Sequence, residues 1–155
     1  MRRNVLCCWL SVIMLMVALP SVCGQTSADQ IVGRFCMLSP LSDDTAIVKI
    51  SRYSDGTYRG RLVWLSQPNN PDGTIRTDSK NKDKKLRNRP YTDVDIFWNL
   101  RYKGTEWVEG VLYNPFDGKR FSVKFSLSKN GRDLTARYYK GVPALGIDAV
   151  WKRVN

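Results

Sequence analysis

Histidine is missing from the sequence, and its absence excludes several common catalytic sites. Histidine is the residue most often used as a general base and metal ligand, and it is the central member of Ser-His-Asp triads. Cysteine is scarce: Cys7, Cys8 and Cys23 lie near the N-terminus, and only Cys36 lies further along the chain. A single cysteine can form neither a zinc site nor an internal disulfide. No glycine-rich phosphate-binding loop follows a predicted strand, so we expect no metal and no cofactor.

Acidic residues are also few: 14 Asp and Glu stand against 25 Lys and Arg, which gives a net charge of +11. A catalytic carboxylate usually needs burial or a close partner that shifts its pKa. Here Asp43 and Asp44 fall in a predicted turn, and Asp95 falls on a solvent-facing position of a predicted strand. We therefore expect that the protein is not an enzyme. The alternative, a hydrolase that uses acids such as Asp78 or Glu109, stays open at this point.

Only one long hydrophobic run is present, and it lies at the N-terminus. Two arginines precede an uncharged stretch of 15 residues from Val5 to Leu19, which is short for a membrane-spanning helix. A basic start, such a stretch and a possible cleavage site at Val22-Cys23-Gly24 are typical of a signal peptide. We predict a signal peptide over residues 1–24 and a single domain over residues 25–155. Lipid attachment through Cys23 is the less favoured alternative, because Val22 stands where lipidation sites carry a smaller residue.

Export changes which partners the positive charge favours. Removal of residues 1–24 takes away Arg2 and Arg3 but no acid, and leaves 23 basic and 14 acidic residues. We expect a periplasmic or secreted protein that does not span the membrane after cleavage. In that compartment nucleic acid is not an expected partner. Anionic lipid head groups, lipopolysaccharide or acidic glycans of the cell envelope are the expected anionic partners.

Along the rest of the chain, hydrophobic and polar residues alternate with a period of two. Phe121, Val123 and Phe125 alternate with polar neighbours, as in a strand that buries one face. Eight such segments are predicted, over residues 31–38, 45–53, 57–66, 94–101, 106–113, 120–127, 132–140 and 147–154. Turn sequences such as Ser54-Asp55-Gly56 separate them. We predict an all-β fold, an antiparallel up-and-down barrel of eight strands, because closure removes the exposed sheet edges.

The segment from Ser66 to Thr92 lacks this period: its 27 residues are polar and rich in turn residues. Its second half is basic, with Arg76, Lys80, Lys82, Lys84, Lys85, Arg87 and Arg89. A loop of this length in a small domain is usually either functional or disordered. We expect one helical turn around residues 82–87, and docking of the end of the loop on the barrel near Leu86 and Pro90.

Tryptophans fall on the predicted strands. Trp64, Trp98 and Trp151 are placed on inward-facing positions by the alternation. An eight-stranded barrel can be filled by its own side chains or can hold one small ligand, so two interpretations are open: core packing and a pocket. For the second, our pocket candidates are Trp64, Trp98 and Tyr138, with Arg87 and Arg89 as candidate contacts to an anionic group of the ligand.

Two short segments resemble the signature of calycins, the lipocalin-like barrels. The first predicted strand contains Gly33-x-Phe35, and the last contains Arg153. The resemblance implies that Arg153 packs over the Phe35 ring by a cation–π contact and closes one end of the barrel. Phe35 replaces the tryptophan that is usual there.

A longer resemblance covers residues 31–154. Its motifs are Leu62-Val63-Trp64-Leu65, Asp78-x-x-Asn81-x-Asp83-x-x-Leu86-Arg87-x-Arg89-Pro90, Trp107-x-x-Gly110-x-x-Tyr113-x-Pro115-x-Asp117-Gly118-Lys119 and Trp151-x-Arg153. They are similar to the bacterial family called domain of unknown function 2147. The resemblance implies an exported protein with a lipocalin-like barrel, and it implies no particular activity. Lys82 and Tyr91-Thr92 depart from the family pattern, so the end of the long loop could differ.

Two functions therefore lead. The first is a lipocalin-like barrel that binds a small apolar or amphipathic ligand, with the basic loop near its mouth. The alternative is an envelope interaction protein that uses the basic loop on anionic lipid, lipopolysaccharide or a protein partner.

Overall fold

The computed structural model describes residues 27–38 and 44–155. The predicted signal peptide, its cleavage site, Cys23 and Asp43 lie outside the described residues. The strands are β1 (Gly33–Leu38), β2 (Thr45–Arg52), β3 (Tyr58–Leu65), β4 (Asp95–Tyr102), β5 (Glu106–Asn114), β6 (Lys119–Leu127), β7 (Asp133–Tyr139) and β8 (Ile147–Val154). Short 3₁₀ helices are η1 (Ser27–Ile31), η2 (Lys84–Leu86), η3 (Tyr91–Asp93) and η4 (Pro143–Leu145).

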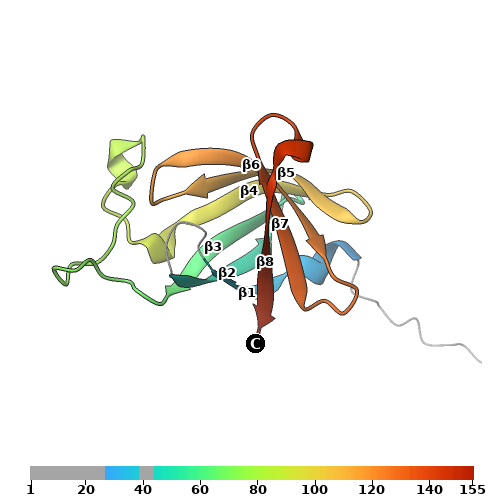
Figure 1. Cartoon of the computed structure of the whole chain (residues 1–155), viewed down its shortest axis with the longest axis horizontal. Coiled ribbons are helices and arrows are strands. Elements are labelled where there is room, and N and C mark those ends of the chain that lie inside the picture. The colour runs from blue at the N-terminus through green and yellow to red at the C-terminus, as the bar shows by residue number, and fades with distance from the viewer. Residues whose placement is uncertain (1–26, 39–43) are drawn as a thin grey trace, which may run out of the picture.

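The strands form a single closed barrel (Figure 1). Each strand pairs antiparallel with the next one along the chain, and β8 returns to pair with β1. The predicted all-β, up-and-down barrel of eight strands is therefore confirmed. The alternation on β6 shows why the chain folds this way: Val123 and Phe125 are fully buried, whereas Lys124 between them points outward and pairs with Glu106 on β5.

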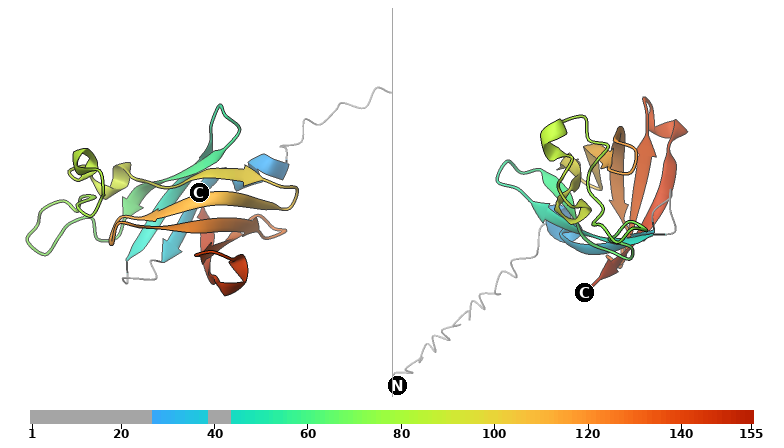
Figure 2. Two further views of the ribbon diagram at one scale, coloured as in Figure 1. Left: turned by 90° about the horizontal axis from the view of Figure 1, so that it is seen from above. Right: turned by 90° about the vertical axis from the view of Figure 1, so that its left-hand side faces the viewer.

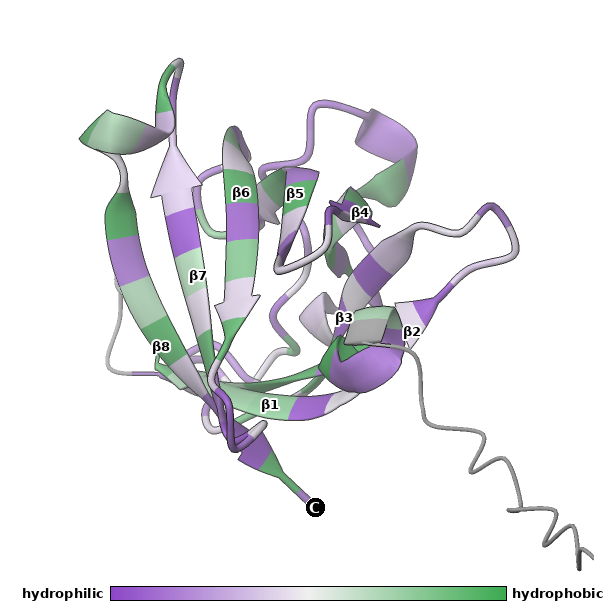
Figure 3. Ribbon diagram, turned by 90° about the vertical axis from the view of Figure 1, so that its right-hand side faces the viewer, coloured by the Kyte–Doolittle hydropathy of each residue, from purple (hydrophilic) through white to green (hydrophobic). Residues whose placement is uncertain are grey.

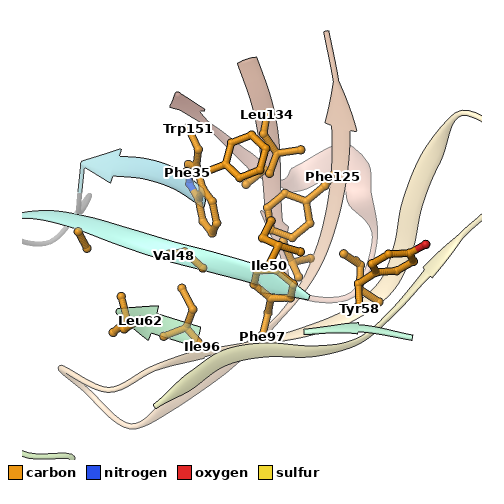
Figure 4. Close-up of a cluster of buried hydrophobic side chains, with 14 of the residues drawn as sticks. Phe35, Val48, Ile50, Tyr58, Leu62, Ile96, Phe97, Phe125, Leu134 and Trp151 are labelled. Carbon is orange, nitrogen blue, oxygen red and sulfur yellow. The ribbon is translucent and has the colours of Figure 1, made fainter. Parts of the chain in front are cut away.

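Aromatic side chains fill one half of the barrel interior (Figure 4). The ring centroids of Phe97 and Phe125 lie 4.9 Å apart, and Trp151 lies 5.2 Å from Phe125 and 6.2 Å from Phe97. Gly60 leaves room for this cluster, because a Cβ at that position would lie 2.1 Å from Cε1 of Phe97. Trp151 is buried on the inner face, as expected from the alternation.

The end of the barrel beside this cluster is closed by η1 and by Arg153. The Arg153 guanidinium lies 4.5 Å from the centroid of the buried Phe35 ring. Its Nε donates to the Gly131 carbonyl at 2.6 Å, and its Nη1 donates to the Val32 carbonyl at 3.0 Å. Its Nη2 donates to the Gln30 carbonyl. One side chain thus links β8 to the chain before β1 and to the β6–β7 turn.

Replacing Arg153 by alanine is expected to lower the free energy of unfolding by about 2–3 kcal/mol, because the cation–π contact and three charge-assisted hydrogen bonds are lost. Arg132→Ala is the matched control, because the Arg132 side chain is exposed beside the same turn. Urea denaturation of both variants measures the difference. Equal stability of the two variants would contradict the role of Arg153 in closing the barrel.

Candidate functional site

A cavity of about 570 Å³ occupies the opposite half of the barrel. It opens at the end of the barrel where the β3–β4, β5–β6 and β7–β8 connections meet. Figure 2 (right) shows this end of the barrel, with the long β3–β4 loop in front of the strands. The inner wall is apolar and includes Leu62, Leu65, Ile96, Leu112, Phe121 and Ala149. Small-molecule sites have volumes of roughly 300–1,000 Å³ and mostly apolar walls, so this cavity has the size and lining of a ligand pocket.

The barrel wall beside the cavity is least complete at the start of β8. This strand pairs with β1 only through its last residues, Lys152–Val154, so its first residues have β7 as their strand neighbour. The β7–β8 connection carries apolar residues at this rim: Leu145 is 80% exposed and Ile147 is 75% exposed, and both line the cavity. Figure 3 shows η4 and the start of β8 as a largely apolar segment. The mouth of the cavity is therefore open beside β8 and is bordered by the exposed side chains of Leu145 and Ile147, which we call the apolar lip.

Tyr138 lines the cavity and supplies one of its few polar atoms. Trp151 Nε1 donates to the Tyr138 hydroxyl oxygen at 3.0 Å. Because an indole N–H only donates, the Tyr138 hydroxyl keeps its own hydrogen for another acceptor. Burial raises the pKa of Tyr138, so this hydroxyl is protonated at neutral pH.

The long loop beside the mouth is folded around one buried carboxylate. Asp78 is 0% exposed, and its Oδ2 accepts from Asn81 Nδ2 at 2.7 Å and from Arg89 Nε and Nη2 at 3.0 and 2.8 Å. Its Oδ1 accepts from the Tyr113 hydroxyl on β5 at 2.6 Å. Burial and this hydrogen bond raise the pKa of Tyr113, which also lines the cavity. We call Asp78, Asn81, Arg89 and Tyr113 the Asp78 cluster.

The same loop also packs against the β5–β6 turn. The Tyr91 hydroxyl donates to the Pro115 carbonyl at 3.3 Å, and its ring lies edge-on to Phe116 at 5.1 Å. Gly118 has a φ of +70°, and a Cβ there would lie 2.3 Å from the Lys80 carbonyl oxygen. Only glycine fits this approach, so the two segments lie in direct contact. The expected helical turn around residues 82–87 is present as η2.

Neither of the two predicted pocket tryptophans, Trp64 and Trp98, lines the cavity. Trp64 is 47% exposed, because the β2–β3 register shifts at Ile47/Val48: Ile47 pairs with Trp64, and Val48 pairs with Leu62. The extra residue, Val63, turns Trp64 away from the face of Leu62, so the inward placement of Trp64 was wrong.

Trp98 requires a similar correction. It is absent from the cavity wall, and its ring lies under the Arg120 guanidinium, 5.4 Å from the centroid. Arg120 precedes the inward-facing Phe121 on β6 and is exposed, so Trp98 packs on the outer face of the barrel.

The two candidate arginines also lie away from the cavity. Arg89 binds Asp78, as described above, and Arg87 Nε donates to the Asn81 carbonyl at 2.8 Å. Neither residue lines the cavity, contrary to the prediction that they contact a ligand. Their positive charges hold the loop together.

The candidate acids of a hydrolase differ in their surroundings. Asp78 has its oxygens engaged by four donors, as described above. Glu109 is 56% exposed on the outer surface, near Arg101 and Lys103. Within residues 27–38 and 44–155, no group of three His, Cys, Asp or Glu side chains could hold a metal ion.

Sequence reasoning missed Lys140 and Asp44 at the mouth of the cavity. Asp44 is 2% exposed and binds Arg76 Nη1 at 2.6 Å. Lys140 follows β7 and lies two residues after Tyr138, and residues spaced by two share a face of a strand. That spacing was the signal that could have placed Lys140 beside Tyr138.

Comparison with known proteins agrees with this architecture. A family model described as "uncharacterized protein conserved in bacteria (DUF2147)" matches residues 38–153. The chain belongs to the DUF2147 family. None of the curated proteins matches it. No helix in the described part of the chain is long and apolar enough to cross a membrane.

A solved structure is similar in fold to this DUF2147 protein. Protein HP1028 from the human pathogen Helicobacter pylori is described as belonging to the lipocalin family. It matches with a TM-score of 0.67 and 24% identity, over 81% of this chain and 83% of that chain. At this identity the likeness shows the fold alone, a lipocalin-like barrel.

Proposed function

We propose that this DUF2147 protein is an exported binding protein, not an enzyme, which holds a small apolar or amphipathic molecule in the cavity at the open end of its barrel. The observation that carries the proposal is the cavity itself, with its volume of about 570 Å³ and its apolar wall. An apolar molecule that enters it leaves water, and roughly 25 cal/mol is gained for each Å² of apolar surface removed from water.

The construction of the barrel supports this proposal. The aromatic cluster and Arg153 close one end, and the cavity opens at the other. The Asp78 cluster holds the long loop beside the mouth without occupying the cavity wall, apart from Tyr113. The basic N-terminus and the uncharged run after it support export.

Ligand binding can be tested on the purified protein with the apolar dye N-phenylnaphthylamine, whose fluorescence rises in apolar surroundings. We expect saturable binding of one dye molecule per chain. Native mass spectrometry, followed by solvent extraction, is expected to reveal any molecule carried through purification. The absence of saturable dye binding would contradict the proposed function.

The basic loop supports a second candidate, binding to an anionic envelope surface such as anionic lipid or lipopolysaccharide. Lys80, Lys82, Lys84 and Lys85 are exposed, and none of them forms an ion pair with a carboxylate of the described residues. The Asp78 cluster holds these four lysines on one folded loop.

For this candidate we expect binding to phosphatidylglycerol vesicles that weakens steeply with salt, because exposed charges are screened beyond about 8–10 Å at physiological ionic strength. Replacing the four lysines by glutamine is expected to abolish it. Vesicle binding that does not change with salt, or no binding at all, would argue against this candidate.

A further inference from the structure

The charges at the mouth of the cavity are not balanced. Among the described residues, its lining contains five charged side chains: Asp44, Asp117, Asp148, Lys119 and Lys140. Each of the three acids has a basic partner, in the pairs Asp44–Arg76 at 2.6 Å, Asp117–Lys119 at 3.2 Å and Asp148–Arg137 at 2.9 Å. Lys140 forms no ion pair with any carboxylate of the described residues. One positive charge at the entrance therefore has no anionic partner within residues 27–38 and 44–155.

Lys140 lies where the apolar wall meets solvent. Its Nζ is 5.1 Å from the centroid of the Phe121 ring, and Phe121 is part of the cavity wall. This contact draws the ammonium toward the entrance. The Tyr138 hydroxyl, two residues earlier on the same strand, is a second hydrogen-bond donor lining the cavity. Both groups come from the end of β7 and from the residue that follows it.

From this arrangement we propose that the ligand is an anionic amphiphile, whose carboxylate or phosphate head group binds the Lys140 ammonium while its apolar tail enters the cavity. The inference rests on the proposed function and adds the class of ligand. Charge-assisted hydrogen bonds from an ammonium are stronger than those between neutral groups, so the head group adds affinity at this position. The excess of basic residues, 23 against 14 acidic residues in 25–155, also favours the approach of an anion.

A pair of probes with the same tail tests the inference: decanoate, which is anionic, and decanol, which is neutral. Isothermal titration calorimetry below the concentrations at which the probes aggregate measures both affinities. We expect decanoate to bind about tenfold more tightly than decanol, as for one charge-assisted contact at a partly exposed site. Lys140→Gln is expected to remove this preference, and Lys140→Arg is expected to retain it.

Lys129→Gln is the matched control. Lys129 is exposed in the β6–β7 turn at the closed end of the barrel, so this variant loses the same net charge away from the mouth. It is expected to keep the preference for decanoate. Equal binding of the two probes to the unaltered protein would overturn the inference while leaving the proposed function intact, as would a preference that survives in Lys140→Gln. Failure of both probes to bind would overturn the proposed function and the inference with it.

Discussion

Replacing Asp78 by alanine is expected to lower the free energy of unfolding by about 3–5 kcal/mol, the usual cost of removing one partner of a buried ion pair. The carboxylate is fully buried and accepts hydrogen bonds from Asn81, Arg89 and Tyr113. Its loss leaves the partly buried Arg89 guanidinium and the Tyr113 hydroxyl without their acceptor. Denaturation with guanidinium chloride measures the change in the free energy of unfolding. Hydrogen exchange is expected to be faster at the backbone amides of residues 78–91.

Asp83→Ala is the matched control for this prediction. Asp83 lies five residues later in the same loop and is exposed, and its side chain caps η2 by accepting from the Lys85 amide at 3.0 Å. Losing such a cap costs about 1 kcal/mol. If Asp83→Ala lowers the free energy of unfolding as much as Asp78→Ala does, the Asp78 cluster is not what holds the loop.

The Asp78 cluster also gives a physical meaning to the two longest motifs of the family resemblance. Asp78, Asn81 and Arg89 belong to the first motif, and Tyr113 and Gly118 belong to the second. In the structure Tyr113 binds Asp78, and Gly118 lies against the Lys80 backbone. The two motifs therefore form one contact between the long loop and the β5–β6 turn. Of the residues in that contact, Tyr113 also lines the cavity, so the contact shapes the rim of the site.

The barrel could be predicted from the sequence because a period of two is a local signal that repeats in every strand. The face of the strand on which a given residue lies is harder to predict, since one extra residue in a bulge moves the residues after it to the opposite face. Trp64 was misplaced for this reason: Val63 is inserted between the pairs Val48–Leu62 and Ile47–Trp64. The alternation itself contains no mark of this insertion.

The order of the long loop could not be predicted from its composition. Its polar residues lack a hydrophobic period, which suits a disordered segment equally well. The loop is folded because Asp78 binds Asn81 and also two partners that lie 11 and 35 residues away, and the two distant pairings leave no local pattern. The cavity could not be predicted from the sequence for the same reason. Its volume depends on side chains from all eight strands and on where the aromatic cluster ends.

Replacing Ala149 by tryptophan is expected to abolish saturable binding of N-phenylnaphthylamine. Ala149 lies on β8, lines the cavity and pairs with Ala136 on β7. An indole at this position projects into the space that a ligand would occupy. Because that space is open, the free energy of unfolding is expected to fall by no more than the roughly 1–3 kcal/mol typical of overpacking.

Val150→Trp separates loss of the cavity from the mere addition of an indole. Val150 is the next residue on β8, is 53% exposed and faces outward. Consecutive strand residues point to opposite faces, so the two variants place the same side chain inside and outside the barrel. We expect Val150→Trp to bind the dye with unchanged affinity. Retained binding in Ala149→Trp would instead place the dye on the exposed apolar lip of Leu145 and Ile147, and the cavity would no longer support the proposed function.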